Sequence, residues 1–119
     1  MVRHYLCNAA AIPEGGARGF DPEATGSDTM FVVRKYGRLY GWRDACPHYG
    51  GTPMAWRKDA YVNADGTRIV CAAHGAQFDM RTGACTLGPC LGQSLDRIEL
   101  AVTQDNDIYI SPEGARRLK

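Results

Sequence analysis

The chain has 119 residues, with 14 basic and 13 acidic side chains and a net charge of +1. This length suits one domain with its own hydrophobic core, so residues 1–119 are expected to form a single domain. The near-zero net charge argues against binding to nucleic acid or to an anionic membrane. No apolar run in the sequence approaches the ~20 residues that span a bilayer.

In chain order, short β signals alternate with turn signals. Residues 2–8 predict an opening strand, and residues 11–27, with two prolines and five Gly or Ser, predict a long loop. Four hairpins are expected after it, at residues 29–44, 60–71, 78–87 and 97–110. Short strands with frequent turns predict an all-β fold, a sandwich or a barrel.

Cysteine usage and the first residues of the chain indicate the compartment. The five cysteines are an odd number, which suits a reducing environment in which thiols bind metal or stay reduced. The opening stretch lacks the apolar segment of a signal peptide, because Asn8 interrupts it and Pro13 follows early. We therefore expect a cytoplasmic protein.

Two short stretches each place one cysteine close to one histidine. Residues 46–54 read "CPHYGGTPM", which contains Cys46 and His48, and residues 71–78 read "CAAHGAQF", which contains Cys71 and His74. Each stretch follows a predicted hairpin, so two loops at the same end of a β domain would bring all four side chains together. Sulfur and imidazole presented on Gly- and Pro-rich loops are typical of a metal site.

These four residues admit three interpretations. Chance is a poor explanation, because the chain has only three histidines and this double pairing uses two of them. A structural zinc site also takes two Cys and two His, but zinc fingers group like ligands together and carry the histidines on a helix. The remaining interpretation is a [2Fe–2S] centre of the Rieske kind, in which two His replace two Cys on one iron.

The sequence resembles the Rieske family, and within it the small soluble ferredoxins of bacterial ring-hydroxylating oxygenases. "CPHYGGTPM" is similar to the first cluster loop, "CAAHGAQFDMRTG" to the second, and "LGPCLG" (Leu87–Gly92) to a third, proline-containing loop that shields the cluster. The resemblance implies a Rieske-type fold, an antiparallel sandwich or barrel base with a small cluster-binding subdomain at about residues 45–92. It also implies a Rieske-type [2Fe–2S] cofactor, with Cys46 and Cys71 on one iron and His48 and His74 on the other.

The resemblance further implies a low reduction potential. High-potential members carry a disulfide between the cluster loops, at the positions of Gly51 and Ala73, and hydroxyl groups at the positions of Ala76 and Phe78. Hydrogen bonds to cluster sulfurs favour the reduced state, so their loss lowers the potential. We therefore expect the low end of the Rieske range of about −150 to +300 mV.

Beyond the predicted cluster, the sequence gives no sign of a catalytic centre. A mononuclear iron site of two His and one carboxylate would have only His4 left, and no Gly-x-Gly-x-x-Gly nucleotide motif is present. The resemblance implies a monomeric electron carrier without catalytic residues, between a flavin-dependent reductase and a non-haem-iron aromatic-ring oxygenase. Two alternatives stay open: the small subunit of a larger redox enzyme such as an assimilatory nitrite reductase, and a metal-stabilised interaction module without a redox role.

Several apolar residues flank the predicted cluster loops. They are expected to form either a docking collar around the cluster or, for Met54 and Trp56, part of the core: Tyr49, Pro53, Met54, Trp56 and Pro89. Arg57 and Lys58 are expected on a solvated turn rather than at a partner contact. The other cysteines, Cys7, Cys85 and Cys90, are expected to pack as small hydrophobes, with Cys90 close to the cluster.

Overall fold

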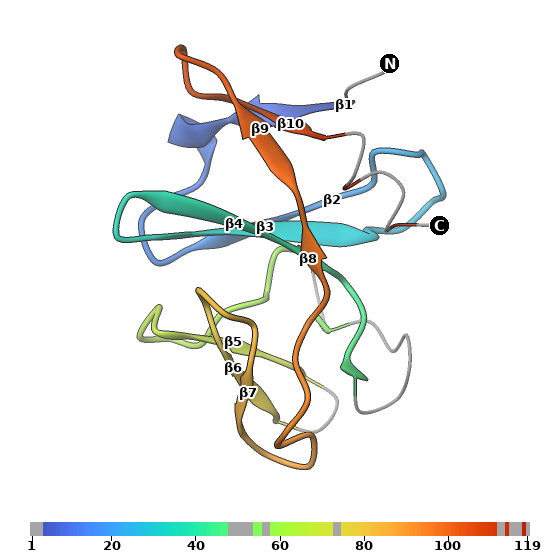
Figure 1. Cartoon of the computed structure of the whole chain (residues 1–119), viewed down its shortest axis with the longest axis vertical. Helices are drawn as coiled ribbons and strands as arrows, with labels where there is room; N and C mark the ends of the chain where they lie inside the picture. Colours follow the sequence, from blue (N-terminus) through green and yellow to red (C-terminus); the bar gives the residue numbers. More distant parts are fainter. Residues whose placement is uncertain are drawn as a thin grey trace.

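A computed structural model describes residues 4–47, 54–55, 58–72, 75–111, 114 and 118 of the chain. Within them the fold is all-β, as predicted, with ten strands arranged in three antiparallel sheets and one short 3-10 helix, η1 (Ala9–Ala11). The described part of the chain contains no helix with the length and hydrophobicity needed to cross a bilayer. Figure 1 shows the sheets stacked along the long axis of the molecule.

The first sheet has the order β1-β10-β9 and joins the two ends of the described chain. Strand β1 (His4–Asn8) pairs with β10 (Asp107–Ile110), which forms a hairpin with β9 (Leu100–Val102). Ile108 and Ile110 alternate with less buried neighbours along β10, as expected for a strand with one face on the core. The predicted opening strand and the hairpin at residues 97–110 are thus confirmed.

The second sheet has the order β2-β3-β4-β8 and forms the middle layer (Figure 1). Strands β3 (Met30–Lys35) and β4 (Arg38–Arg43) form the hairpin predicted at residues 29–44. Strand β8 (Arg97–Ile98) pairs with β4, and β2 (Ala17–Phe20) pairs with β3. The prediction that residues 11–27 form only a loop was wrong at β2, because pairing with β3 outweighs the local Gly and Pro content.

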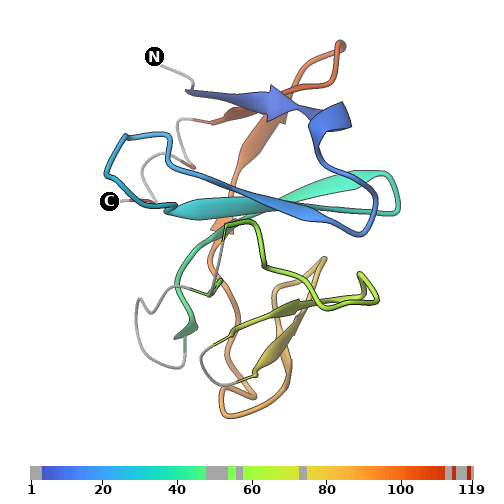
Figure 2. The same ribbon diagram turned by 180° about the vertical axis from the view of Figure 1, so that it is seen from behind.

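The third sheet, of order β5-β6-β7, is small and lies at one end of the molecule, as Figures 1 and 2 show from opposite sides. Strands β6 (Gln77–Asp79) and β7 (Cys85–Leu87) form the hairpin predicted at residues 78–87. Strand β5 (Arg68–Val70) belongs to the hairpin predicted at residues 60–71. Its partner segment is reduced to a single bridge between Val62 and Ile69.

The middle sheet separates two hydrophobic cores. Along β3, Met30 and Val32 face the core shared with the first sheet, whereas Phe31 and Val33 face the core shared with the third. Successive side chains of a strand point to opposite faces, so a sheet covered on both faces gives an uninterrupted buried run. We call the second of these clusters the lower core, after its place in Figure 1; its buried members are Phe31, Val33, Trp42, Cys46, Met54, Tyr61, Ile69, Cys71, Ala76, Phe78, Met80, Cys85, Cys90 and Leu95.

Candidate metal centre

Cys46, the first predicted ligand, lies in the lower core directly after β4. Its side chain is 1% exposed. The strand is continued by backbone hydrogen bonds from Arg43 to the carbonyl of Asp96 and from Asp44 to the carbonyl of Thr29, both 2.9 Å. These bonds position Cys46 at the edge of the middle sheet, facing the third sheet. Residues 48–53 lie outside the described part of the chain, and His48 is among them.

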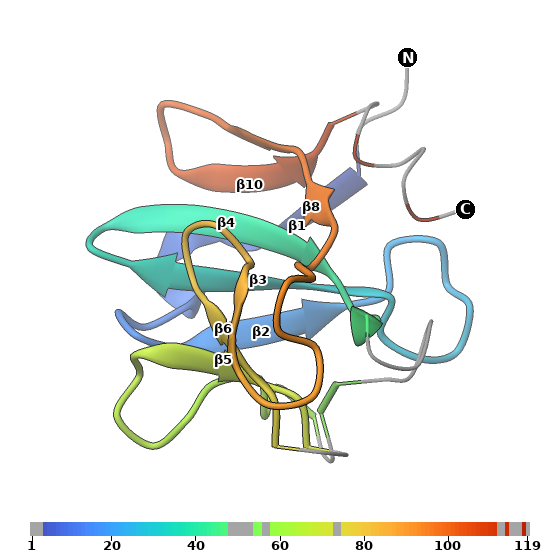
Figure 3. The ribbon, with the colours of Figure 1, turned by 60° about the horizontal axis from the view of Figure 1, so that its bottom comes forward.

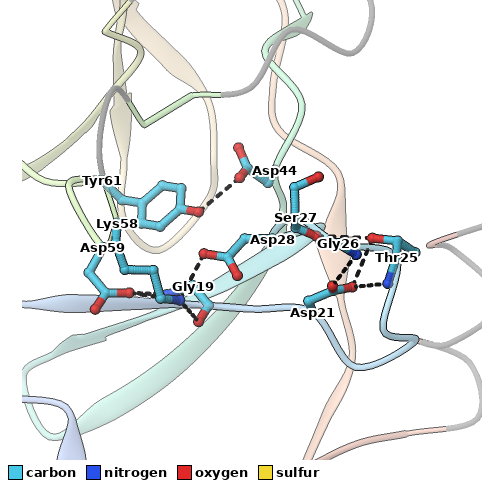
Figure 4. Close-up of polar contacts among 10 residues, drawn as sticks. All are labelled: Gly19, Asp21, Thr25, Gly26, Ser27, Asp28, Asp44, Lys58, Asp59 and Tyr61. Carbon is cyan, nitrogen blue, oxygen red and sulfur yellow. Dashed lines mark hydrogen bonds and ion pairs between the residues drawn. The ribbon is translucent and has the colours of Figure 1, made fainter.

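The two ends of the first predicted loop meet at one carboxylate. Asp44 Oδ1 accepts a hydrogen bond from the backbone N–H of Met54 (2.8 Å), and Oδ2 accepts one from the hydroxyl of Tyr61 (2.8 Å; Figure 4). Burial raises the pKa of Asp44, whereas these two hydrogen bonds lower it in part. Burial and the Asp44 charge also raise the pKa of Tyr61, so its hydroxyl stays protonated and donates. Asp44 therefore closes the segment that contains Cys46 and His48.

Cys71, the third predicted ligand, begins the second loop directly after β5 and is fully buried. Its backbone N–H donates to the carbonyl of Ala76 (2.8 Å), and its carbonyl accepts from the N–H of Gly75 (2.8 Å). Gly75 has a φ of +70°, a conformation that glycine adopts without strain. The segment from Cys71 to Ala76 is therefore a closed loop. Residues 73 and 74 within it lie outside the described part of the chain, and His74 is one of them.

One hydrogen bond joins the two loops directly. The backbone N–H of Ala72 donates to the carbonyl of Met54 (2.8 Å), so the end of the first loop is fixed against the start of the second. Cys46 and Cys71 belong to the same buried cluster, the lower core. The loops that the sequence predicts to cooperate are therefore adjacent in space.

The segment after β7 packs on the second loop, as Figure 3 shows from the end of the molecule. Gly88 has a φ of +109°, and a Cβ atom placed on it would lie 2.8 Å from the Cα of Ala76. Pro89 is exposed and Cys90 is buried in the lower core. Two causes raise the pKa of the Cys90 thiol to about 12: its burial, which has the larger effect, and its hydrogen bond with Cys85. The expectation that Cys90 lies near the cluster loops agrees with this packing.

The chain after the first loop is anchored to β2. Lys58 Nζ donates to the carbonyl of Gly19 (2.7 Å) and forms ion pairs with Asp28 (2.8 Å) and Asp59 (3.3 Å; Figure 4). Asp59 in turn accepts a hydrogen bond from the N–H of Gly19 (2.8 Å). Partial burial lowers the pKa of Lys58, but the carboxylates of Asp28 and Asp59 together raise it by a larger amount. The net pKa is raised, so the ammonium stays charged. The Lys58 charge is therefore paired with two carboxylates of its own chain.

The predicted docking collar is only partly described. Met54 is fully buried in the lower core, so its alternative assignment as a core residue is the correct one. Tyr49, Pro53 and Trp56 lie outside the described residues, as do Gly51, Arg57 and Ala73. Two exposed apolar side chains outside the predicted collar, Leu87 (56% exposed) and Leu91 (64% exposed), flank the segment from Gly88 to Cys90.

The described residues supply half of the predicted donor set. In residues 4–47, 54–55, 58–72 and 75–111, no group of three or more His, Cys, Asp or Glu could hold a metal ion. Both predicted histidines, His48 and His74, lie outside these residues, so this absence does not bear on the predicted set of four ligands. Cys46 and Cys71 fit a thiolate-bound iron in type and placement, since both sulfurs are shielded from water on adjoining loops.

The family model "Rieske [2Fe-2S] domain" matches residues 3–105. The chain therefore belongs to the Rieske [2Fe–2S] family, and its cofactor is a Rieske-type [2Fe–2S] cluster. Such a domain is an electron carrier.

Three proteins show how this chain compares with known relatives. It is 25% identical to the ferredoxin of carbazole 1,9a-dioxygenase from Nocardioides aromaticivorans IC177, over 94% of this chain and 99% of that one, with a TM-score of 0.70. It is 30% identical over 99 residues to cytochrome b6-f complex iron-sulfur subunit 1 of Cyanophora paradoxa, which covers 82% of this chain but only 38% of that protein. A putative NADH-dependent nitrite reductase small subunit from Mycobacterium tuberculosis shares the fold, at 16% identity over 92% of this chain and 93% of that one, with a TM-score of 0.64.

Proposed function

We propose that this Rieske domain is a ferredoxin that carries single electrons from a flavin-dependent reductase to a non-haem-iron aromatic-ring oxygenase. The observation that carries this proposal is the near-complete overlap with the carbazole dioxygenase ferredoxin, which spans 94% of one chain and 99% of the other. We further propose that residues 1–119 form one domain and that the protein acts in the cytoplasm as a monomer, because a shuttle must leave one partner before it meets the next.

We propose four residues as the cluster ligands. Cys46 and Cys71 would bind the inner iron, and His48 and His74 the outer one. The burial of both cysteines supports the first pair, and the hydrogen bond from Ala72 to Met54 supports the meeting of the two loops. The bound cluster supplies one-electron redox chemistry. The protein closes the loops through Asp44, excludes water through the lower core and presents a docking face.

The surroundings of the cluster loops support a low reduction potential. Ala76 and Phe78 are fully buried in the lower core with Cys46 and Cys71. Neither side chain has a hydroxyl group that can donate to a cluster sulfur. A potential at the low end of the Rieske range suits exchange with a flavin reductase and a second Rieske centre.

Spectroscopy and potentiometry test this proposal. The dithionite-reduced protein is expected to give the rhombic EPR signal of a mixed-ligand [2Fe–2S] centre. Its midpoint reduction potential is expected to be about −150 mV. A midpoint above about +200 mV would instead place the protein with carriers of cytochrome complexes, as the name of its Cyanophora relative suggests. A colourless zinc protein after anaerobic preparation would support the metal-stabilised interaction module and contradict the redox role altogether.

Replacing His48 tests the ligand assignment. The substitution His48→Cys would give the outer iron a thiolate and is expected to move the potential toward that of plant-type ferredoxins, about −400 mV. His4→Cys is the matched control, because His4 lies in β1, at the end of the molecule away from the third sheet. An intact cluster with an unchanged potential in the His48 variant would show that His48 is not a ligand.

The nitrite reductase small subunit is the second candidate, because a protein of that kind shares the fold over almost its whole length. A permanent subunit buries a large apolar interface, whereas a shuttle forms a small one. Size-exclusion chromatography coupled to light scattering, with the cognate proteins present, separates the two. A stable stoichiometric complex with a large flavoprotein would favour the subunit.

A further inference from the structure

Two cysteines that the proposed electron transfer does not use lie next to each other beside the candidate metal centre. The Sγ atoms of Cys90 and Cys85 are 3.0 Å apart, with the Cys90 thiol donating. Cys85 Sγ is 3.4 Å from the carbonyl oxygen of Leu87 and donates to it. The two sulfurs are only about 1 Å farther apart than in a disulfide bond. Both side chains are thiols and both are buried.

The backbone holds these two sulfurs together. The N–H of Cys85 donates to the carbonyl of Gln93, and the N–H of Gln93 donates to the carbonyl of Cys90, both at 2.9 Å. Cys85 is also fixed in β7, opposite Phe78 of β6. The segment from Cys85 to Gln93 therefore returns on itself, and bond formation requires movement only inside this segment.

We propose that Cys85 and Cys90 form a reversible dithiol–disulfide couple, a redox modification site whose oxidant is a low-molecular-weight disulfide. The Cys85 thiolate attacks one sulfur of that disulfide, so that a mixed disulfide forms and one small thiol leaves. The Cys90 thiol then gives up its proton, attacks the Cys85 sulfur and displaces the second small thiol. Two electrons and two protons pass from the pair to the oxidant, which is reduced to two thiols.

Exposure sets the order of these steps. Cys85 is 8% exposed and Cys90 is 1% exposed, so the oxidant reaches Cys85 first and Cys90 acts as the resolving thiol. Both values are small, and exchange in the folded protein is accordingly slow. The disulfide forms between residues that are not among the proposed ligands, so the cluster stays in place.

The new bond would act on the surface beside the cluster loops. Cys90 ends the segment that packs through Gly88 on Ala76, and the exposed side chains of Leu87 and Leu91 flank it. Linking Cys90 to β7 restrains this segment and the two leucines. Oxidation therefore changes the freedom of an apolar surface next to the cluster rather than the cluster itself.

A single tryptic peptide reports on the couple. Cleavage after Arg81 and Arg97 releases residues 82–97, which contain Cys85 and Cys90 and none of the other three cysteines. The holoprotein is incubated anaerobically in glutathione buffers with rising proportions of glutathione disulfide, then quenched with acid, labelled with N-ethylmaleimide and digested. The peptide is expected to lose two hydrogens and to take up no label. A phosphine reductant is expected to restore both thiols, with the visible spectrum of the cluster unchanged.

Variants separate the two thiols. Cys90→Ser is expected to stop at a glutathione adduct on Cys85, and Cys85→Ser is expected to leave Cys90 unmodified. Cys7→Ser is the matched control and is expected to behave as the unaltered protein, since Cys7 lies in the core on the opposite face of the middle sheet.

Three results for the unaltered protein would each overturn the proposal, whether or not the variants fold. The first is a peptide that stays fully labelled in the most oxidising buffer, while the same peptide from urea-unfolded protein is oxidised. The second is a stable glutathione adduct on Cys85 in place of the internal bond. The third is a disulfide that appears only after the absorbance of the cluster is lost.

Discussion

The Asp44 carboxylate connects three parts of the chain that are separate in sequence. It follows β4, accepts the N–H of Met54 at the end of the first cluster loop, and accepts the hydroxyl of Tyr61. The ring of Tyr61 stacks on Phe31 of β3, with centroids 4.2 Å apart and planes 9° from parallel. A largely buried carboxylate needs hydrogen-bond donors. The N–H of Met54 and the protonated hydroxyl of Tyr61 therefore both stabilise Asp44 in this position.

The hydroxyl of Tyr61 is therefore expected to contribute measurably to stability. Tyr61→Phe keeps the stacking on Phe31 but leaves Asp44 with one donor fewer, which is expected to cost about 2 kcal/mol. The midpoint of urea unfolding, followed by far-UV circular dichroism, measures the loss, and the decay of visible absorbance measures cluster retention.

Tyr5→Phe is the matched control for this change. The Tyr5 ring is exposed and its hydroxyl is 3.5 Å from Asp107, a distance too long for a strong hydrogen bond. Its removal is expected to shift stability by less than about 0.5 kcal/mol. Equal effects of the two substitutions would show that the contact with Asp44 carries no special energy.

Ala76 offers a position for tuning the cluster. The substitution Ala76→Ser places a hydroxyl donor in the lower core that contains Cys46 and Cys71, where a sulfur of the bound cluster would be its acceptor. A hydrogen bond to the cluster stabilises the reduced form, so the midpoint potential is expected to rise by on the order of 50 mV. Protein-film voltammetry measures the shift. Ala9→Ser, a change at a buried alanine on the opposite face of the middle sheet, is expected to leave the potential unchanged.

At the scale of elements, the third sheet and the segment after it form a support for the second cluster loop. The hydrogen bond between Cys71 and Ala76 closes the loop between β5 and β6. The backbone of Gly88, in the segment after β7, lies close to the backbone of Ala76. The contact is between backbone atoms, so side-chain rearrangement cannot relieve a larger residue there.

Gly88→Ala tests this support. The added Cβ would lie 2.8 Å from the Cα of Ala76, and the backbone has a φ of +109° that alanine rarely adopts. The two penalties together are expected to cost about 3 kcal/mol and to speed loss of the cluster on heating. Thermal unfolding and the rate of bleaching measure the two effects.

Gly92→Ala separates strain from contact. Gly92 has a φ of +91° but nothing within 4 Å of an added Cβ, so it keeps the conformational penalty without the collision. Its expected cost is about 1 kcal/mol, and its cluster should be as stable as in the unaltered protein. If both variants lost the cluster equally fast, the contact between Gly88 and Ala76 would have no part in holding it.

Sequence patterns predicted the elements whose signals are local. The β3–β4 hairpin has a buried apolar run, a turn at Tyr36 and Gly37 and a second run, all within 14 residues from Met30 to Arg43. Strand β2 escaped prediction because its pairing with β3 arises from tertiary contact, while its own residues include glycine and follow a proline-containing stretch. Asp44 escaped for a similar reason, since its donor Tyr61 is 17 positions away and no motif marks the pair.

The contact between Cys85 and Cys90 depends on the return of the chain at Gln93, which no turn motif predicted. By contrast, the family and its cofactor were predicted from the resemblance of three short stretches, including the two Cys/His stretches, to the family's cluster loops, and the family match confirms both. Local chemistry was thus predictable where the residues lie close in sequence. Contacts made by folding were not.

At the scale of the whole molecule, the two hydrophobic cores lie on opposite faces of the middle sheet, and only the lower core contains proposed ligands. The first and middle sheets form a base, and the middle and third sheets enclose the lower core with Cys46 and Cys71 (Figure 1). The molecule measures 37 × 29 × 24 Å, with the third sheet at one end of the long axis. A partner that approaches this end meets the cluster loops and the exposed leucines before it meets the base. Cys46 and Cys71 therefore lie in the half of the molecule that contains the third sheet, away from the first sheet.

This division predicts the effect of charge on docking. Leu91 is 64% exposed beside the buried Cys90, so Leu91→Asp would place an unpaired charge in an apolar contact and is expected to slow electron transfer to the proposed oxygenase partner about tenfold. The potential should not change, because the side chain points to solvent. Val102→Asp is the matched control, since Val102 is 47% exposed on β9 in the base. Stopped-flow reoxidation of the reduced protein at limiting oxygenase measures both; equal rates for the two variants would place docking elsewhere on the surface.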